Sequence, residues 1–376
     1  MSRLRVLALE PYYGGSHRSF LDGWSHHSRH EFDTLGLPAY KWKWRMRHSA
    51  LTLSEQVNER VATGESWDIL FCSDMLPLAE FCGLVSPEVA RLPRIFYFHE
   101  NQLTYPTRTS SERDHHFAFT NFVSAAAANR VWFNSAFHQD AFLSAMEAFL
   151  KRMPDFEPLT QLETLRTASH VHSPGIPSHP PRGERKPGPL RILWAARWEH
   201  DKGPDEFFEA LSRLRESHKF ELYVLGESFD DSPPIFETAR ERFAAEIRQW
   251  GFVKEQADFF NILRTSDVIV STATHEFFGI AVAEAVAAGT IPVVPRRLAY
   301  PEVTSEIDHP QCIYDGSVDD LVDKLQFWCK LADSDGIEPS FTKQMQASVD
   351  RYLWPRRACE MDDAIEDSVA MFNGQP

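Results

Sequence analysis

The sequence of 376 residues contains little cysteine, and its cysteines are not arranged for cross-links. Cys72, Cys82, Cys312, Cys329 and Cys359 are odd in number, widely spaced and without a C-x-x-C pair. Neither a disulfide framework nor a cysteine-based zinc site is therefore expected. We expect reduced thiols that serve as packing residues.

Long apolar runs are also missing. Residues 1–15 (MSRLRVLALEPYYGG) have a basic start, but Glu10 ends their apolar stretch early. The best later candidate, THEFFGIAVAEAVAAG at residues 274–289, is interrupted by Glu284. A signal peptide needs a longer apolar core, and a membrane helix needs about 20 apolar residues. The sequence therefore predicts a soluble, cytoplasmic protein.

Positive charge is scarce relative to negative charge. The chain has 39 Lys and Arg residues against 54 Asp and Glu residues, a formal net charge of −15. Broad, non-specific binding to nucleic acid depends on a basic surface and is not expected. A local basic patch remains compatible with this total.

A complete dinucleotide-binding fingerprint is absent as well. Gly14 and Gly15 follow the first apolar segment, but the full G-x-G-x-x-G is missing. A dinucleotide-dependent dehydrogenase is therefore not expected. The flexibility of the two glycines better suits a loop that approaches a donor phosphate or an acceptor, with His17 close by.

Material for large hydrophobic cores is plentiful. The chain is 43% hydrophobic, with 10 Trp and 28 Phe, and its length suits two domains. Short apolar segments alternate with segments long enough for helices, which is the pattern of an α/β protein with a parallel sheet covered on both faces. The strand candidates of the first half are residues 3–10, 68–72, 94–98 and 130–133.

A stretch dense in proline and glycine, residues 173–190, is typical of a linker. After it the same alternation begins again. We therefore expect two doubly wound, Rossmann-like domains, residues 1–182 and 188–348, with ligands bound at the carboxyl ends of the strands, in the cleft where the domains face each other. Residues 349–376 are expected to form a helix, interrupted at Pro355, that could pack back on the N-terminal domain.

Two cations follow the first strand of the second domain. Arg197 and Lys202 lie five residues apart in AARWEHDKGPDEFF, and Gly203 and Pro204 lead into a predicted helix. The free amides of that helix end favour anions, so a pyrophosphate is the expected ligand. An exposed turn whose cations make surface ion pairs is the alternative.

Two carboxylates lie around a helix start further along. Glu276 is expected in a loop after a buried strand, Gly279 permits close approach of the backbone, and Glu284 lies inside the following helix. The rise of a helix separates Gly279 from Glu284 by about 7–8 Å. Carboxylates accept hydrogen bonds from hydroxyls, and the amides near Phe278 and Gly279 could meet phosphate oxygens. Sugar, phosphate and ribose together describe a nucleotide sugar.

The ordered combination of AARWEHDKG, GFV at residues 251–253 and SDVIVSTATHEFFGIAVAEAVAAGTIPVV resembles the retaining glycosyltransferases of family 4, which have the GT-B fold. The resemblance covers about residues 190–295. It implies that Glu276 contacts the donor sugar, that Glu284 contacts the ribose, and that Arg197 and Lys202 stabilise the diphosphate without a metal. Base contacts are expected near Gly226 and Phe252. His275 departs from the pattern, since many relatives have a small residue there.

The first half resembles a small group of glycosyltransferases that mannosylate queuosine in tRNA. The segments that carry the likeness are EPYYGGSH at 10–17, LPAYKWKWRMRHSAL at 37–51, FYFHENQLTYP at 96–106 and FNSAFHQDAF at 133–142. The resemblance implies an N-terminal acceptor domain, a C-terminal donor domain and transfer of mannose from GDP-mannose to queuosine in an anticodon. It adds His99 to Glu276, Arg197 and Lys202 as an expected catalytic residue.

The acceptor side has its own candidate residues. If KWKWRMR is extended, strict alternation places Lys41, Lys43, Arg45 and Arg47 on one face, spaced for the phosphates of a single strand. A half-buried strand with a solvated basic face is the alternative, but a basic row in so acidic a chain favours an RNA contact. Asn101 and Gln102 are further candidates for acceptor or sugar contacts.

Other functions remain open at this point. The same frame could serve a transferase with another donor and a small-molecule acceptor, or a nucleotide-sugar epimerase or hydrolase. It could also serve a non-catalytic binding protein, although the presence of Arg197, Lys202, Glu276 and Glu284 disfavours that function.

Overall fold

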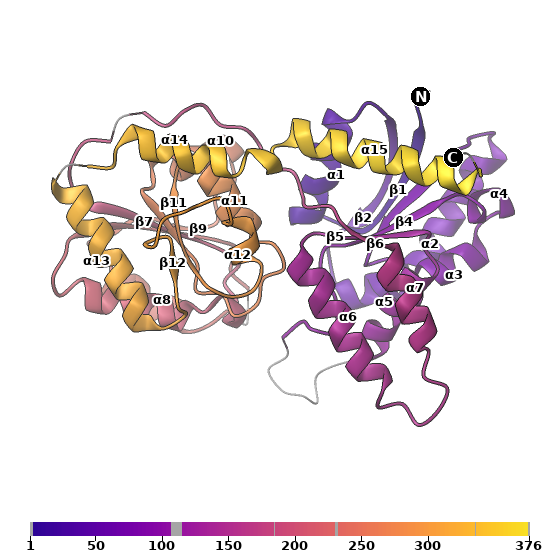
Figure 1. Cartoon of the computed structure of the whole chain (residues 1–376), viewed down its shortest axis with the longest axis horizontal. Coiled ribbons are helices and arrows are strands. Elements are labelled where there is room, and N and C mark those ends of the chain that lie inside the picture. Colours follow the sequence, from indigo (N-terminus) through magenta and orange to yellow (C-terminus); the bar gives the residue numbers. More distant parts are fainter. Residues whose placement is uncertain (1–2, 107–114, 184, 230–231, 335, 375–376) are drawn as a thin grey trace. The chain divides into compact units, whose positions relative to one another are not determined.

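The computed structural model describes residues 3–106, 115–183, 185–229, 232–334 and 336–374, and it divides the chain into two units. Unit 1 contains Met1–Gly175 and Trp354–Pro376, and unit 2 contains Ile176–Leu353. The chain therefore passes from one unit to the other twice (Figure 1). None of the helices in the described ranges is both long enough and apolar enough to cross a membrane.

Unit 1 is built on a six-stranded parallel sheet in the order β2-β1-β3-β4-β5-β6. The strands are β1 (Arg5–Tyr13), β2 (Glu31–Pro38), β3 (Ile69–Ser73), β4 (Arg94–Phe98), β5 (Arg130–Phe133) and β6 (Ser169–Val171). Since successive side chains of a strand point to opposite faces, an apolar strand such as β1 supplies both faces of the sheet.

The helices of unit 1 cover both of these faces. They are α1 (Gly15–His27), α2 (Trp42–Ala62), α3 (Leu78–Leu84), α4 (Pro87–Ala90), α5 (His115–Ala126), α6 (Ala136–Leu150), α7 (Leu159–Ala168) and α15 (Trp354–Phe372). Val6 and Ala8 of β1 pack with residues of α1 and α15. Leu7 and Leu9 pack on the opposite side with residues of α2, α3, α5 and α6. Figure 1 shows α15 lying along α1.

Unit 2 repeats this plan with a second six-stranded parallel sheet in the order β12-β11-β10-β7-β8-β9. Its strands are β7 (Leu190–Ala195), β8 (Phe220–Leu225), β9 (Ile247–Gly251), β10 (Val268–Val270), β11 (Ile291–Pro295) and β12 (Ile313–Tyr314). Its helices are η2 (His200–Lys202), α8 (Pro204–Leu214), α9 (Ile235–Arg242), α10 (Gln256–Thr265), α11 (Ile280–Ala287), α12 (Tyr300–Val303), α13 (Val318–Ser334), α14 (Pro339–Ser348) and η3 (Asp350–Tyr352). The predicted α/β class, with two doubly wound parallel sheets, is confirmed.

The boundaries between the units differ from those that proline density suggests. The first change falls after Gly175, because Ile176 is fully buried in the core of unit 2 and its amide donates to the Tyr352 carbonyl at 2.8 Å. The return to unit 1 falls at Trp354 instead of at residue 349. Pro355 is the second residue of α15, so the proline lies in the first turn and does not interrupt the helix. A proline in the first turn removes no hydrogen bond of the helix.

The prediction of an extended segment at residues 41–47 is wrong. Lys41 has a left-handed backbone and precedes α2, which runs from Trp42 to Ala62. In a helix the side-chain directions repeat every 3.6 residues. The strict alternation of KWKWRMR therefore does not place the cations on one face and the aromatic rings on the other. Met46 faces inward, whereas Trp44 is 61% exposed.

Candidate active site

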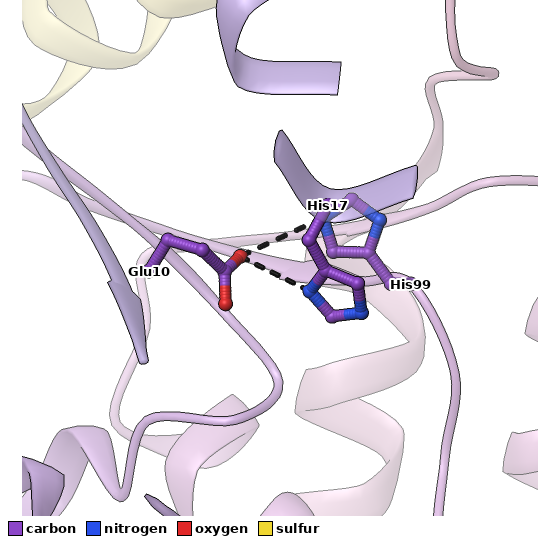
Figure 2. A group of neighbouring side chains, drawn as sticks. All are labelled: Glu10, His17 and His99. Carbon is purple, nitrogen blue, oxygen red and sulfur yellow. Dashed lines mark ion pairs between the residues drawn. The ribbon is translucent and has the colours of Figure 1, made fainter. Parts of the chain in front are cut away.

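Three side chains from separate elements of unit 1 meet near the carboxyl ends of its strands. Glu10 belongs to β1, His17 to the first turn of α1, and His99 directly follows β4. Glu10 Oε2 lies 3.2 Å from His17 Nδ1 and 3.9 Å from His99 Nε2. The two imidazole rings stack with their centroids 3.9 Å apart. Figure 2 shows both rings turned toward the one carboxylate.

Pairing with Glu10 gives the two buried histidines different charge states. Burial alone would lower the pKa of His17, but the charge and hydrogen bonding of Glu10 outweigh it and raise this pKa to about 9. Burial and then the positive charge of His17 hold the pKa of His99 well below its ordinary value. At neutral pH, His17 is therefore protonated beside Glu10, and His99 is neutral.

Hydrogen bonds with neighbouring residues hold Glu10 and the backbone of His99 in place. Glu10 Oε1 accepts from the Tyr12 amide at 2.8 Å and from Ser73 Oγ at 2.9 Å, which fixes the carboxylate. Asp74, directly after β3, accepts from the His99 amide at 2.9 Å. Burial raises the pKa of Asp74 well above its ordinary value.

This cluster also has the donor atoms that a metal ion uses. The ligand atoms of Glu10, His17 and His99 lie within 4.8 Å of one another, and within the described ranges no other group of three such residues does. The buried atoms His99 Nε2 and Asp74 Oδ2 make no hydrogen bond within the described part of the chain, whereas Glu10 Oε2 and His17 Nδ1 face each other at 3.2 Å. Buried polar atoms of this kind usually have a partner, which a substrate hydroxyl, a water or a cation would supply.

The glycines of this region have distinct conformations. Gly14 is the N-cap of α1 with an extended backbone, and a Cβ there would lie 2.4 Å from Ala39 Cβ. Gly15 begins α1 with a φ of 52°, in the left-handed region. Gly14 therefore leaves no room for a side chain, whereas the backbone conformation favours glycine at position 15, and a donor-binding role for both remains a prediction.

Asn101 and Gln102 lie in the loop after β4 and are both buried. The Asn101 side-chain oxygen accepts from the amides of Leu103 and Thr104, and its nitrogen lies 3.0 Å from His138 Nε2. Gln102 donates to Glu100 at 3.0 Å. These bonds hold the loop that follows His99, so a positioning role fits Asn101 better than direct contact with a ligand.

In unit 2 the two predicted cations have unequal surroundings. Arg197 follows β7, and its side chain is 50% exposed with a 3.3 Å ion pair to Glu199. Lys202 is buried, and its Nζ lies 2.9 Å from the His275 carbonyl, 3.1 Å from Asp201 and 3.5 Å from Glu276. Burial by itself would lower the pKa of Lys202, but the charges of Glu276 and Asp201 raise it, so this lysine is a fixed cation.

Glu276 lies in the loop between β10 and α11, where its Oε1 accepts from the Phe278 amide at 3.5 Å. Burial favours the neutral acid, yet the charge of Lys202 and the Phe278 amide hold the pKa of Glu276 below its ordinary value. It is therefore ionised at neutral pH. The neighbouring His275 is buried against Phe277, and burial together with the Lys202 charge lowers the pKa of His275 to about 4.

The start of α11 forms one wall of a small recess. Gly279, its N-cap, has a φ of 92°, and a Cβ there would lie 2.9 Å from a ring carbon of Tyr300. Other residues that line the recess are Lys202, Ser271, Glu276, Ala281 and Tyr300. A fixed cation, a carboxylate and a helix N-terminus therefore converge, which suits a phosphate joined to a sugar.

Glu284 lies one turn into α11. Its carboxylate makes no hydrogen bond or ion pair with other described side chains, and burial raises its pKa to about 7. Phe252 follows β9 and is 64% exposed. Gly226 follows β8 with a φ of 152°, and a Cβ there would lie 1.9 Å from the Ala196 carbonyl oxygen. This close approach explains the glycine at that strand end.

Sequence reasoning missed Glu10, Asp74 and Asp201. A carboxylate inside the otherwise apolar run RLRVLALE is a signal that could have singled out Glu10, because a buried charge needs a partner. Asp74 follows a predicted strand, as His99 does, and parallel strands end at one edge. Asp201 lies next to Lys202 and carried no separate signal.

Comparison with protein families gives two matches in succession. Residues 5–176 match the family described as tRNA-queuosine alpha-mannosyltransferase N-terminal, and residues 176–335 match glycosyl transferases group 1. The chain is 34% identical over 339 residues to the tRNA-queuosine alpha-mannosyltransferase of Drosophila melanogaster, covering 87% of both proteins. It is 24% identical over 192 residues, half of each protein, to a GDP-mannose:cellobiosyl-diphosphopolyprenol alpha-mannosyltransferase of Xanthomonas oryzae.

Solved structures give the same fold at low identity. Anabaena HepE, in complex with UDP and glucose, has a TM-score of 0.66 at 14% identity and covers 97% of this chain and 100% of its own. Sucrose-phosphate synthase from Thermosynechococcus elongatus has a TM-score of 0.69 at 12% identity and covers 98% of this chain and 100% of its own. The predicted GT-B architecture is thereby confirmed.

Proposed function

Because this chain belongs to the tRNA-queuosine alpha-mannosyltransferase family, we propose that it transfers mannose from GDP-mannose to queuosine in a tRNA anticodon, with retention of configuration. The chain is a glycosyltransferase that uses a nucleotide-sugar donor and a tRNA acceptor. The likeness to the Drosophila enzyme across 87% of the chain is the observation that carries the proposal.

On the donor side we assign the diphosphate to Arg197, Lys202 and the amides at the start of α11. Lys202 is already held by Asp201 and Glu276, so its charge needs little reorganisation as negative charge develops on the leaving diphosphate. Preorganised charge of this kind is a large contribution to catalysis. It requires no metal ion at the diphosphate.

Glu276 and Glu284 then bind the two ends of the donor. Glu276, ionised beside Lys202, accepts hydrogen bonds from sugar hydroxyls, and Glu284, about one turn into α11, accepts from the ribose. The exposed ring of Phe252 and the backbone around Gly226 border the base. Mannose is supported by the family, and guanine by the second mannosyltransferase relative, whose name gives GDP-mannose as its donor.

On the acceptor side we assign the queuosine to the carboxyl edge of the unit 1 sheet. His99 Nε2 and Asp74 Oδ2 are buried polar atoms without hydrogen-bond partners among the described residues, and a diol can satisfy them beside the stacked His17 ring. In a retaining transfer the leaving phosphate oxygen takes the acceptor proton, so His99 need only orient the hydroxyl. Its neutral ring carries one N–H, which can donate to the hydroxyl oxygen while the hydroxyl proton passes to the phosphate.

Incubation of the purified protein with queuosine-containing tRNA and, separately, GDP-mannose, GDP-fucose, UDP-glucose and UDP-galactose tests the proposal. Mass spectrometry of the digested nucleosides should show a hexose added to queuosine only with GDP-mannose. Release of free nucleoside diphosphate without any addition to RNA would contradict the tRNA acceptor and favour a hydrolase or a small-molecule acceptor. Glu276→Gln serves as the control, because it keeps the side-chain shape and removes the charge.

A further inference from the structure

Two aromatic rings at the start of α2 are mostly exposed, although the Trp44 ring centroid lies 5.0 Å from that of His48. Tyr40, just before the helix, is 63% exposed, and Trp44 in its first turn is 61% exposed. Large aromatic side chains usually bury most of their surface, so two such rings four residues apart indicate a binding surface. The same rings offer flat faces on which nucleic-acid bases can stack.

Basic side chains surround these rings. Lys41, Lys43 and Arg47 are exposed, and none of them forms an ion pair within the described part of the chain. No Asp or Glu occurs between Asp33 and Glu55, although the whole chain has a net charge of −15. The Lys41 ammonium lies 5.2 Å from the Tyr40 ring centroid. The positive charge is therefore concentrated where the rings are exposed.

The buried side of the start of α2 packs close to the cluster of Glu10, His17 and His99. Met46 packs with Met75 and Phe117 in a small core, against which Tyr12 and Trp42 also lie. The Tyr12 ring contacts the His17 ring at 5.8 Å between centroids, and Met75 follows Asp74 directly. The start of α2 thus neighbours Glu10, His17 and His99 through this core.

We propose that the start of α2 is the docking surface for the anticodon loop of the acceptor tRNA. Tyr40 and Trp44 stack on unpaired bases of the loop, while Lys41, Lys43 and Arg47 contact its phosphates. The inference rests on the proposed function and deepens it, because it assigns the RNA contact to aromatic rings on a helix. A single-stranded loop fits better than a duplex, since only unpaired bases expose their faces for stacking.

Binding of a queuosine-containing anticodon stem-loop RNA, measured by fluorescence anisotropy without donor, tests the aromatic part. Tyr40→Ala and Trp44→Ala should each weaken binding by about tenfold, the usual effect of losing one stacked base. Phe156→Ala is the matched control, since Phe156 is 96% exposed in the same unit and should leave the affinity unchanged. The KM for GDP-mannose should stay unchanged in all three variants.

The salt dependence of the same affinity tests the basic part. The slope of log K against log salt falls by about one for each phosphate contact that is removed. Lys41→Gln combined with Lys43→Gln should therefore reduce the slope by about two, whereas Lys151→Gln, an exposed lysine on α6, should not change it.

The possible results distinguish a failure of the proposed docking surface from a failure of the proposed function. Wild-type RNA affinity in Tyr40→Ala and Trp44→Ala would overturn the surface, even if the enzyme mannosylates tRNA. Failure of the wild-type protein to modify tRNA would refute the function, while the RNA affinities would still decide the surface. The wild type could bind phosphatidylserine vesicles and Trp44→Ala could lose this binding while its RNA affinity stays unchanged. That result would show that the surface binds a membrane and not the anticodon loop.

Discussion

Lys202 of unit 2 is held in place by its neighbours. Its ammonium lies between Asp201, Glu276 and the His275 carbonyl, and these contacts keep a buried charge in place before any donor arrives. The exposed side chain of Arg197 would lose more conformational entropy than Lys202 when a donor binds. The two side chains therefore differ in their expected contributions, although both were predicted from one short motif.

We predict that Lys202→Met lowers kcat/KM for transfer by about a hundredfold or more, the usual effect of removing one preorganised charge at a leaving group. Lys219→Met, at an exposed position before β8, is the control. Steady-state kinetics with GDP-mannose measures both variants. A fall of less than threefold would show that Lys202 holds the loop and does not act on the diphosphate.

Glu284 predicts a dependence on pH. Since burial raises its pKa to about 7, the carboxylate ionises near neutrality, and only the ionised form accepts from both ribose hydroxyls. The KM for GDP-mannose should therefore fall as the pH rises through about 7, and this trend should be absent in Glu284→Gln. An unchanged trend in the variant would place the ribose elsewhere.

Glu284 also makes the free energy of unfolding depend on pH. A rise in pH should improve donor binding but should lower the stability of the fold. A carboxyl whose folded-state pKa exceeds its unfolded value destabilises the fold increasingly as pH rises from that unfolded value through the folded one. Glu284→Gln should therefore be more stable than the wild type at about pH 8, by up to about 3 kcal/mol, and equally stable at about pH 4. Chemical denaturation at the two pH values measures the difference.

At the scale of elements, the ends of strands and the starts of helices create the sites. In unit 1, β1, β3 and β4 are neighbours in the sheet, so Glu10, Asp74 and His99 come together although they are far apart in sequence. In unit 2, the loops after β7 and β10 bring Lys202 and Glu276 together because those strands also pair. Parallel pairing of neighbouring strands is therefore the reason that both clusters exist.

Gly279 provides a test at this scale. Gly279→Ala introduces a Cβ at a φ of 92° and 2.9 Å from the Tyr300 ring, so the start of α11 should shift and donor affinity should fall by about tenfold or more. Gly64→Ala is a close control, since Gly64 has a φ of 90° with no atom near the added Cβ. Donor titration by calorimetry compares the two variants. Equal affinities would contradict a role for the α11 terminus.

At the scale of the whole molecule, the C-terminal helix completes the first unit. Asp362 of α15 is buried and accepts from Trp24 Nε1 at 2.9 Å, from Ser28 Oγ at 2.7 Å and from the Arg29 amide at 2.8 Å. Three donors from α1 and the turn after it thus depend on one carboxylate near the end of the chain. The N-terminal sheet lacks part of its cover until the last helix has been added.

We predict that Asp362→Ala destabilises unit 1 by about 2–4 kcal/mol, because it leaves three donors without an acceptor. Asp363→Ala is the control, since the Asp363 side chain is 62% exposed and, among the described residues, pairs only with Arg29. Hydrogen exchange followed by mass spectrometry should show faster exchange in α1 and β1 for Asp362→Ala, with unit 2 unchanged. Equal protection in both variants would contradict this role of α15.

Metal dependence is a further property of the whole enzyme. If Arg197 and Lys202 stabilise the diphosphate, transfer activity should survive extensive dialysis against a chelator. Loss of activity that zinc restores in the wild type, but not in His17→Ala, would contradict this prediction and place a metal at Glu10, His17 and His99. Elemental analysis of the purified protein is an independent measurement of the same point.

The sequence alone was sufficient for the fold class, whereas the donor-binding role of the loop around Glu276 remains a prediction. Apolar strands that alternate with helices leave a doubly wound sheet as the favoured arrangement, and β4 and β5 were predicted with their observed bounds. The prediction of β1 began and ended too early, because Glu10, a charged residue, looked like the end of a strand that in fact continues to Tyr13. β2 was not predicted, since its polar residues mark an edge strand with weak apolar periodicity.

The amino-acid sequence by itself determined the two sheets and the local signals of Lys202, Gly279 and Glu284, because short-range periodicity and turn chemistry act within a few residues. Only the tertiary structure decided that Glu10 joins His17 and His99, and that residues 41–47 begin a helix whose aromatic rings stay exposed. Such contacts depend on which strands are neighbours and on what packs beneath a helix. These are properties of the folded chain that no local pattern contains.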